Sequence, residues 1–163
     1  MATSNKNLSE YDKEKIENGA DLNIGIVVSE WNTSITSNLC QGAIDTLIEN
    51  GVLEGNIIIR KVPGAFELPL GAQFLLKYKE LDGVIAVGTV IQGETKHFDF
   101  VCQGTTDGLM KVMLEQNTPI SFCVLTDNNV EQSIARSGGV HGNKGIEAAA
   151  SLLQMIALHK TFL

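Results

Sequence analysis

Positive charge is scarce in this chain. Its 12 lysine and arginine residues are outnumbered by 19 aspartate and glutamate residues, which gives a formal net charge of -7 at pH 7. An acidic protein repels the phosphate backbone of DNA and RNA, so nucleic acid is excluded as a general partner. An anionic small molecule can bind only where local donors outweigh this negative field.

Cysteine, histidine and long apolar runs are also scarce. The three cysteines, Cys40, Cys102 and Cys123, lie within apolar periodic segments, which is typical of reduced, buried thiols rather than disulfides. The three histidines are far apart and no paired cysteine motif occurs, so no metal site is predicted. The polar N-terminus has no signal core, and no stretch approaches the roughly 18 apolar residues of a membrane span, which favours the cytoplasm.

Glycine-rich phosphate loops are absent as well. The first apolar run ends in Ser29-Glu30-Trp31-Asn32, which contains no glycine, so the chain has neither a Walker loop nor a dinucleotide fingerprint. Phosphoryl transfer and hydride transfer therefore lack their binding loops, and no cofactor is predicted. A cysteine nucleophile beside His97 would have to be Cys102 or Cys123, and the apolar pattern predicts that both are buried.

The sequence does contain a regular alternation of strand and helix patterns. Four short apolar runs predict buried parallel strands at residues 24–28, 57–62, 84–87 and 120–125. Apolar residues at helical spacing follow each run, near residues 35–47, 69–76, 98–112 and 130–134. A glycine-rich turn at residues 137–142 then leads into a last helix around residues 146–156.

Four strand-helix units predict one α/β domain over residues 22–163. Its architecture is a three-layer α/β/α sandwich around a four-stranded parallel sheet, which resembles the flavodoxin-like class. Residues 1–21 form a polar N-terminal arm that is expected to be disordered or held against a neighbouring subunit.

The loops after the predicted strands contain the candidate functional residues, because ligands bind at the carboxyl ends of parallel strands. The third loop leads to His97, in or near the first turn of a helix. The positive end of a helix dipole disfavours imidazolium, so a neutral imidazole that accepts a proton fits this position. Free backbone N–H groups at Gly93-Glu94-Thr95 offer a phosphate seat, with Thr95 as N-cap. The alternative is that Thr95 only caps the helix and His97 is an ordinary surface residue.

Three further side chains have two interpretations each. Trp31, the only tryptophan, either stacks on a planar ring or covers the edge of the core. Glu67, next to Phe66, either accepts hydrogen bonds from hydroxyl groups or is a charge at a helix start. Arg136 either binds phosphate through two parallel hydrogen bonds or complements a helix dipole. The residues alone leave these alternatives open.

Three long motifs carry a family resemblance. They are Val62-Pro63-Gly64-Ala65-Phe66-Glu67-Leu68-Pro69, Gly88-Thr89-Val90-Ile91 with Gly93-Glu94-Thr95-Lys96-His97-Phe98, and Gly142-Asn143-Lys144-Gly145. In this order they resemble the 6,7-dimethyl-8-ribityllumazine synthase family, from about residue 22 to the C-terminus. The resemblance implies an enzyme of riboflavin biosynthesis that condenses 5-amino-6-(D-ribitylamino)uracil with 3,4-dihydroxy-2-butanone 4-phosphate to 6,7-dimethyl-8-ribityllumazine, releasing phosphate and water.

The resemblance also implies how the pyrimidine substrate is held. Trp31 would stack on the pyrimidine ring. Ala65-Phe66-Glu67 would hold the ribityl chain, and Thr89-Val90-Ile91 would meet the edge of the uracil.

The butanone phosphate is assigned to a second group of residues by the same resemblance. Glu94-Thr95 would seat the phosphate through backbone N–H groups, with Arg136 as its countercharge and Lys144 as a further contact. His97 would transfer protons. Phe122 would arrive from an adjacent subunit to close the ring site.

Three positions depart from the commoner family pattern. Gln92 stands where many members carry lysine or arginine, which leaves one fewer positive charge near the phosphate. Trp31 replaces a frequent phenylalanine and offers a larger stacking face that would also suit a flavin. Asp127-Asn128-Asn129 follows Thr126, where many members have a second threonine.

Assembly and alternative functions follow from the same comparison. Members of the family form homopentamers with active sites between subunits, and some pack twelve pentamers into a hollow icosahedral shell of sixty subunits, with riboflavin synthase as a possible partner. The segment from Ser137 to Lys144 lacks the insertion of pentamer-only members, which favours the shell. A flavin-binding or shell-forming protein that has lost turnover is the alternative, although the retained His97 argues against it. A signalling receiver would need an aspartate where the third strand ends in Gly88-Thr89.

Overall fold

The computed structural model describes residues 7–163 and contains a four-stranded parallel sheet in the order β2-β1-β3-β4. The strands are β1 (Ile24–Ser29), β2 (Ile57–Val62), β3 (Gly83–Ile91) and β4 (Ile120–Asp127). The helices are α1 (Thr33–Glu49), α2 (Leu68–Tyr78), α3 (His97–Gln116), α4 (Val130–Arg136) and α5 (Lys144–Lys160). Single 3-10 turns occur at η1 (Lys13–Lys15), η2 (Glu54–Asn56) and η3 (Ala65–Glu67), and a small antiparallel pair joins β5 (Ser137–Gly139) to β6 (Gly142–Asn143).

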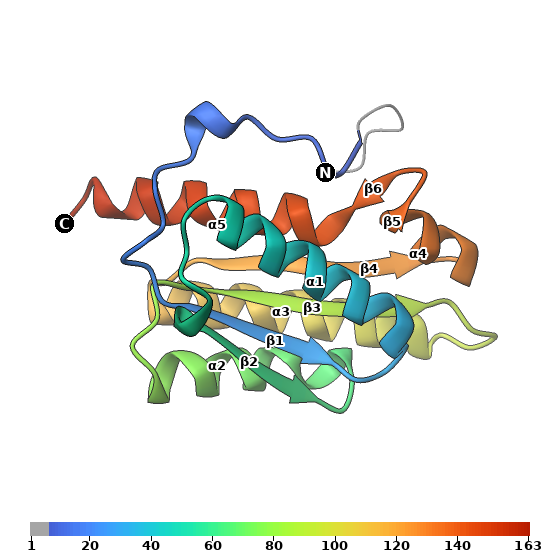
Figure 1. The fold of residues 1–163 in the computed structure, drawn as a ribbon. Helices are drawn as coiled ribbons and strands as arrows, with labels where there is room; N and C mark the ends of the chain where they lie inside the picture. Colours follow the sequence, from blue (N-terminus) through green and yellow to red (C-terminus); the bar gives the residue numbers. More distant parts are fainter. Residues whose placement is uncertain (1–6) are drawn as a thin grey trace.

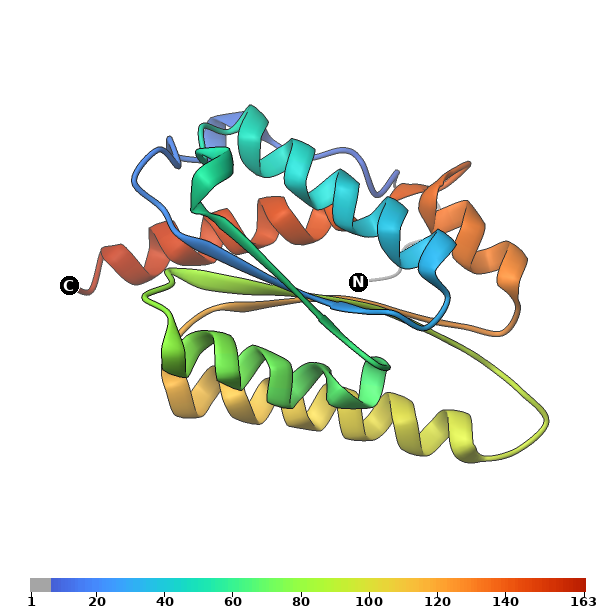
Figure 2. The same cartoon turned by 60° about the horizontal axis from the view of Figure 1, so that its bottom comes forward.

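Helices cover both faces of the sheet. Figures 1 and 2 show α1 and α5 on one face and α2 and α3 on the other. This is the predicted three-layer, flavodoxin-like α/β/α architecture. No helix within residues 7–163 has the length and apolar character needed to span a bilayer.

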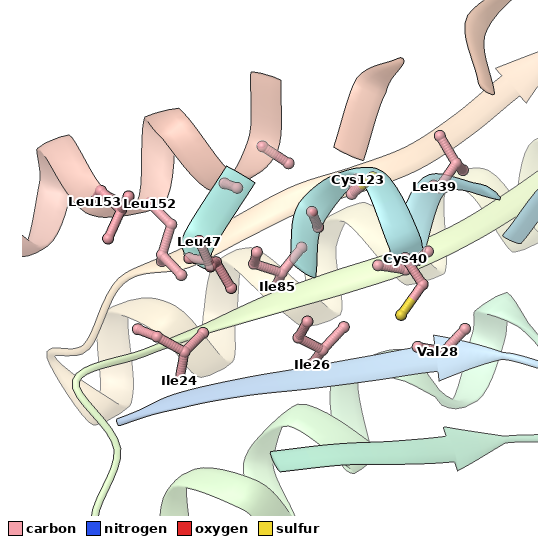
Figure 3. Packing of buried hydrophobic residues seen from close by; sticks show 14 of the residues in the cluster. Ile24, Ile26, Val28, Leu39, Cys40, Leu47, Ile85, Cys123, Leu152 and Leu153 are labelled. Atoms are coloured by element: carbon pink, nitrogen blue, oxygen red, sulfur yellow. The ribbon is translucent and has the colours of Figure 1, made fainter. Parts of the chain in front are cut away.

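The core has two halves because β1 is buried on both faces. On the α1 and α5 side, Ile24 and Ile26 pack against Leu47 and Leu152 (Figure 3). The other half places Val27 of the same strand against side chains of α2 and α3, among them Leu68 and Leu109. Fully burying each of these large side chains contributes about 1.5–3 kcal/mol relative to leaving it exposed. The prediction of a buried strand from the apolar run at residues 24–28 is therefore confirmed.

Two segments differ from the sequence prediction. β3 does not end at Val87 but continues to Ile91, because its pairing with β4 extends as far as Ile91 opposite Asp127. The glycine-rich segment predicted as a turn forms the β5–β6 hairpin, where Gly138 and Gly142 adopt φ angles of 117° and 83° that other residues rarely adopt.

The described part of the N-terminal arm lies on its own chain. Leu8 donates its backbone N–H to the carbonyl of His141 at 2.8 Å, and the backbone N–H of Asn143 donates to the hydroxyl of Ser9 at 3.0 Å. Farther along, Ile16 packs against the core. The arm was expected to be disordered or held against a neighbouring subunit. In the structure, residues 7–21 contact other parts of the same chain, which neither expectation included. Residues 1–6 lie outside the described part of the chain.

Helices α1 and α5 are in close backbone contact at Gly145, where an added Cβ atom would overlap the carbonyl oxygen of Leu39. Asn143 fixes the same crossing. Its side-chain oxygen accepts the N–H of Gly145 at 2.8 Å, and its amide donates to the carbonyl of Asn38 at 2.9 Å. The start of α5 therefore depends on glycine at this position.

We expect Gly145→Ala to lower the free energy of unfolding by about 3 kcal/mol, because the added methyl group must push two helix backbones apart. Gly55→Ala is the matched control, since no atom lies within 4 Å of a Cβ added there, and its effect should stay within about 0.5 kcal/mol. Urea denaturation at one fixed protein concentration measures both. Equal midpoints for the two variants would show that the α1–α5 crossing tolerates a side chain.

Candidate active site

A cavity of about 860 Å³ opens where the strands end. This volume lies in the range of about 300–1,000 Å³ that is typical of small-molecule sites. Its walls are formed by the β1–α1 loop, η3 with the preceding Gly64, the end of β3 with the loop that follows it, the start of α3 and one residue of α4. The lining residues are Trp31, Asn32, Gly64, Ala65, Phe66, Glu67, Thr89, Val90, Ile91, Gly93, Thr95, His97, Phe98, Phe100, Val101 and Val130. The loops after all four strands were expected to converge: those after β1, β2 and β3 meet at this cavity, and from the segment after β4 only Val130 lines it.

Trp31 stands at the rim of this cavity, and its side chain is 71% exposed. A tight loop holds it there: Asn32 adopts the left-handed conformation with φ 57° and ψ 50°, and the backbone N–H of Trp31 donates to the hydroxyl of Ser29 at 3.3 Å. An indole this exposed does not cover the core. Its face is available to a planar ligand.

The end of β3 forms one wall. β1 pairs with β3 only as far as Val28 opposite Val87, so residues 88–91 have a neighbouring strand on the β4 side alone. On the opposite side of β3 no strand binds the backbone of these residues, within the part of the chain described. Thr89, Val90 and Ile91 therefore present a free strand edge to the cavity, and such an edge can hydrogen-bond a planar amide-like ligand.

His97 is the first residue of α3, as predicted. Its exposed side chain lines the cavity and makes no hydrogen bond or ion pair with any residue of the described chain. The prediction that Thr95 caps this helix is wrong: the N-cap is Lys96, without a side-chain cap, and Thr95 accepts the N–H of His97 only at 3.4 Å. The imidazole is free to meet a ligand.

The loop before α3 is the candidate anion seat. Gly93 and Thr95 line the cavity and Glu94 lies between them, although its own side chain is not part of the lining. The backbone N–H groups of these three residues donate to no other described residue, and they precede a 20-residue helix whose dipole attracts anions.

Besides Glu94, three of the predicted substrate-binding residues do not line this cavity. Phe122 lies on β4, at the edge of the sheet, with 38% of its side chain exposed. Lys144 begins α5, and its Nζ lies 2.7 Å from a carboxylate oxygen of Glu147. Arg136 ends α4, outside the cavity. Within one chain, these residues are not brought to the site.

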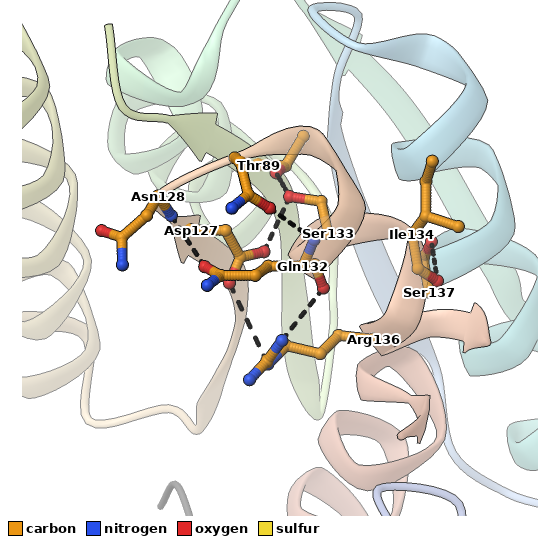
Figure 4. A network of polar contacts seen from close by, with 9 residues as sticks. Thr89, Asp127, Asn128, Gln132, Ser133, Ile134, Arg136 and Ser137 are labelled. Carbon is orange, nitrogen blue, oxygen red and sulfur yellow. Dashed lines mark hydrogen bonds and ion pairs between the residues drawn. The ribbon is translucent and has the colours of Figure 1, made fainter. Parts of the chain in front are cut away.

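Arg136 belongs instead to a polar network around Asp127 (Figure 4). Its Nε lies 4.0 Å from Asp127 Oδ1, and its Nη1 donates to the carbonyl of Gln132 at 3.1 Å. Ser133 donates to the other oxygen of Asp127 at 2.7 Å and lies 3.2 Å from the hydroxyl of Thr89 in the cavity wall. The network ties α4 to the ends of β3 and β4. It was not predicted, because no pattern in the sequence indicates that Thr89, Asp127 and Ser133 lie together.

Phe98, Phe100 and Val130 are cavity residues that sequence reasoning missed. Phe98 matched the helical period of α3 and therefore resembled a core position. Phe100 lies off that period with 68% of its side chain exposed, so an aromatic on the polar face of the helix was the signal that could have indicated a ligand site.

The cysteines do not act as nucleophiles here. Cys123 is fully buried, and desolvation raises the pKa of its thiol to about 12, so the thiol stays protonated at neutral pH. Burial also raises the pKa of Cys40 and of Cys102, although Cys102 is only half-buried rather than in the core as expected. Across residues 7–163, no group of three or more metal-ligating side chains comes together.

Comparison with known proteins decides the family. A family model described as 6,7-dimethyl-8-ribityllumazine synthase matches residues 21–160. This chain belongs to the 6,7-dimethyl-8-ribityllumazine synthase family. Curated relatives of that name resemble it over most of its length. The lumazine synthase of Christiangramia forsetii is 56% identical over 161 residues, 98% of this chain and 96% of its own. That of Flavobacterium johnsoniae is 57% identical over 95% of this chain and 82% of its own, and that of Porphyromonas gingivalis is 49% identical over 98% and 99%.

The resemblance seen in the three motifs is thus confirmed. This member of the lumazine synthase family is an enzyme of riboflavin biosynthesis. The two other functions considered, a protein without turnover and a signalling receiver, gain no support from these relatives.

The exposed indole generates a prediction about ligand binding. We expect Trp31→Ala to weaken binding of a lumazine ring about tenfold, because stacking a base-like ring on an aromatic side chain contributes roughly 1–3 kcal/mol. Trp31→Phe keeps an aromatic face and should retain most of the affinity. Isothermal titration calorimetry compares the variants. Equal affinities for alanine and phenylalanine would mean that the ring does not stack at residue 31.

Proposed function

We propose that this chain condenses 5-amino-6-(D-ribitylamino)uracil with 3,4-dihydroxy-2-butanone 4-phosphate to 6,7-dimethyl-8-ribityllumazine. The carrying observation is one cavity in which Trp31, the turn at residues 65–67, the free edge of β3 and His97 all meet. Membership of the lumazine synthase family supports the same reaction.

The pyrimidine lies on the Trp31 side of the cavity in this proposal. The indole stacks on the pyrimidine ring, and the unpaired edge of residues 89–91 meets the polar edge of the uracil. Phe66 packs against the ribityl chain, while the carboxylate of Glu67 accepts hydrogen bonds from its hydroxyl groups. A ring and a flexible polyol are thus bound by different walls.

The butanone phosphate lies at the start of α3. Free backbone N–H groups at residues 93–95 bind the phosphate, as helix N-termini commonly do. Gln92 adds no charge, and in this proposal Arg136 supplies the countercharge. Because Arg136 does not line the cavity of its own chain, a second copy supplies it in the assembled enzyme, together with Phe122 and Lys144.

The reaction needs no nucleophile from the protein, because the amine of one substrate attacks the ketone of the other. Aligning two reactants contributes about 7–11 kcal/mol to lowering a barrier. His97, which lies at the cavity without a protein partner, moves protons as water and phosphate leave. General acid-base catalysis of this kind typically adds about 10²–10⁴-fold.

The proposed assembly is a homopentamer. α2 presents Leu70, Phe74 and Tyr78 on one exposed stripe, with 52%, 52% and 67% of each side chain accessible, and such an apolar stripe is typical of a subunit interface. The short hairpin at residues 137–143 favours further packing of twelve pentamers into an icosahedral shell, which could enclose riboflavin synthase. Three free thiols fit a cytoplasmic location.

One experiment tests the reaction and the assembly together. The two substrates are mixed with the purified protein, lumazine absorbance is followed, and light scattering gives the particle mass. Product formation by a particle larger than one subunit is expected. Binding of riboflavin without any product would favour a protein that has lost turnover.

Replacing the proposed proton carrier and the proposed countercharge should have different effects. We expect His97→Ala to lower kcat about 10²-fold without abolishing product, because alignment of the substrates remains. Arg136→Ala should mainly raise KM for butanone phosphate. Arg60→Ala, on the exposed strand β2, is the control and should leave both constants unchanged. Equal and complete loss in the first two variants, with folding intact, would contradict this division of roles.

A further inference from the structure

The turn at residues 65–67 is bound to α3 by a buried hydroxyl group. Thr105 is completely buried, and its Oγ1 donates to the carbonyl of Ala65 at 3.0 Å. The next residue behaves differently: Thr106 is exposed and donates to the carbonyl of Cys102 in its own helix at 2.7 Å. Thr105 thus directs its hydroxyl away from its helix and toward the turn.

Two glycines beside Thr105 let the turn approach the helix backbone. A Cβ atom added to Gly104 would lie 2.7 Å from Cε2 of Phe66, and one added to Gly108 would lie 2.7 Å from Cγ of Pro69. Both distances are shorter than real carbon contacts. The ring of Phe66 and the first turn of α2 therefore rest directly on α3, which lies beside α2 below the sheet in Figure 2.

Few other hydrogen bonds hold this turn. Its N-cap, Gly64, has no side chain to cap it, and the backbone N–H of Glu67 donates to the carbonyl of Gly64 at 3.3 Å. The backbone N–H of Leu68 also donates to the carbonyl of Ala65, but that bond is local and moves with the turn. By contrast, the hydrogen bond from the Thr105 hydroxyl to the carbonyl of Ala65 joins the turn to a different element, helix α3.

The same helix begins at His97. Thr105 lies eight positions after His97, about 12 Å along the axis at the rise of an α-helix. Because an α-helix of this length is stiff, anchoring the turn at Thr105 also fixes the distance from Phe66 and Glu67 to the imidazole. The pyrimidine-binding turn and the proton carrier are then held by one rigid element.

We propose that Thr105 is a positioning residue for the pyrimidine substrate, and that Gly104 provides the space in which the Phe66 ring lies. The hydroxyl of Thr105 touches no substrate and acts through the turn at residues 65–67. The inference rests on the proposed role of that turn in holding the ribityl chain.

The test compares Thr105→Val with Thr105→Ser in the full-length enzyme. Valine keeps the size of the side chain and removes the hydroxyl, so KM for 5-amino-6-(D-ribitylamino)uracil should rise about tenfold, since misplacing a binding group by about 1 Å can cost more than this. KM for butanone phosphate should change less than about twofold, because the anion seat precedes the helix. Serine restores the hydroxyl and should restore the pyrimidine KM.

Thr106→Val is the matched control, because it makes the same chemical change one residue farther on without touching the turn. It should leave both KM values unchanged. A loss that appears equally in both KM values, or equally in Thr105→Val and Thr106→Val, would reflect general damage to α3 and would overturn the proposal.

Gly104→Ala provides a second route that leaves the hydrogen bond in place. Its methyl group displaces the Phe66 ring, so the same selective rise in pyrimidine KM is expected even if Thr105→Val folds poorly. Phe66→Ala separates the two levels of inference. If Phe66→Ala raises the pyrimidine KM while Thr105→Val and Gly104→Ala do not, positioning by α3 is wrong and the binding role of the turn stands. If Phe66→Ala has no effect, both fail.

Discussion

The structure depends on the unequal pairing of β3 with its two neighbours. β4 accompanies β3 to Ile91, whereas β1 leaves it after Val87. The last four residues of β3 are therefore held in an extended strand by β4, while their other edge has no neighbouring strand among the described residues. This open edge forms one wall of the cavity, and the β1–α1 loop, the turn at η3 and the start of α3 form further walls. If β3 ended earlier, the cavity would lack the wall formed by residues 88–91. If β1 were longer, it would pair with this edge and occupy the cavity.

The sequence predicted those parts of the molecule that local physics determines. The apolar run Ile24 to Val28 predicted a strand, because both faces of this strand are buried. The apolar spacing from Ile35 to Leu47 predicted a helix, because one face of this helix is buried. Trp31, Phe66 and His97 were found because they follow strands whose carboxyl ends must meet. The end of β3 was not found, because Gly88-Thr89 resembles a loop until its pairing with β4, distant in sequence, is known. The network that links Thr89, Ser133, Asp127 and Arg136 was not predicted either. Its residues are distant in sequence, and no periodicity indicates that they meet.

Electrostatics explain why the proposed anion seat relies on backbone groups. The chain carries a formal charge of -7, Gln92 is neutral, and Arg136 lies 4.0 Å from the carboxylate of Asp127. A guanidinium that already faces a carboxylate supplies less net attraction to phosphate than a free one. The backbone N–H groups of residues 93–95 donate to no other described residue, and the dipole of the following helix adds to their effect. We therefore propose that the loop before α3 provides the phosphate seat and that Arg136, from a second copy of the chain, orients the phosphate.

Because the substrates contain their own nucleophile and electrophile, geometry must supply most of the rate enhancement. Alignment can contribute about 7–11 kcal/mol, whereas a proton carrier that adds 10²–10⁴-fold contributes about 2.7–5.5 kcal/mol. The larger contribution requires that the two halves of the site do not move relative to each other. α3 meets this requirement, since the helix follows the proposed anion seat, begins at His97 and holds the turn at residues 65–67 about two helical turns later. The thiols of this enzyme, protonated and mostly buried, take no part in that arrangement. Rigidity of the scaffold is therefore the catalytic property that this sequence encodes most directly.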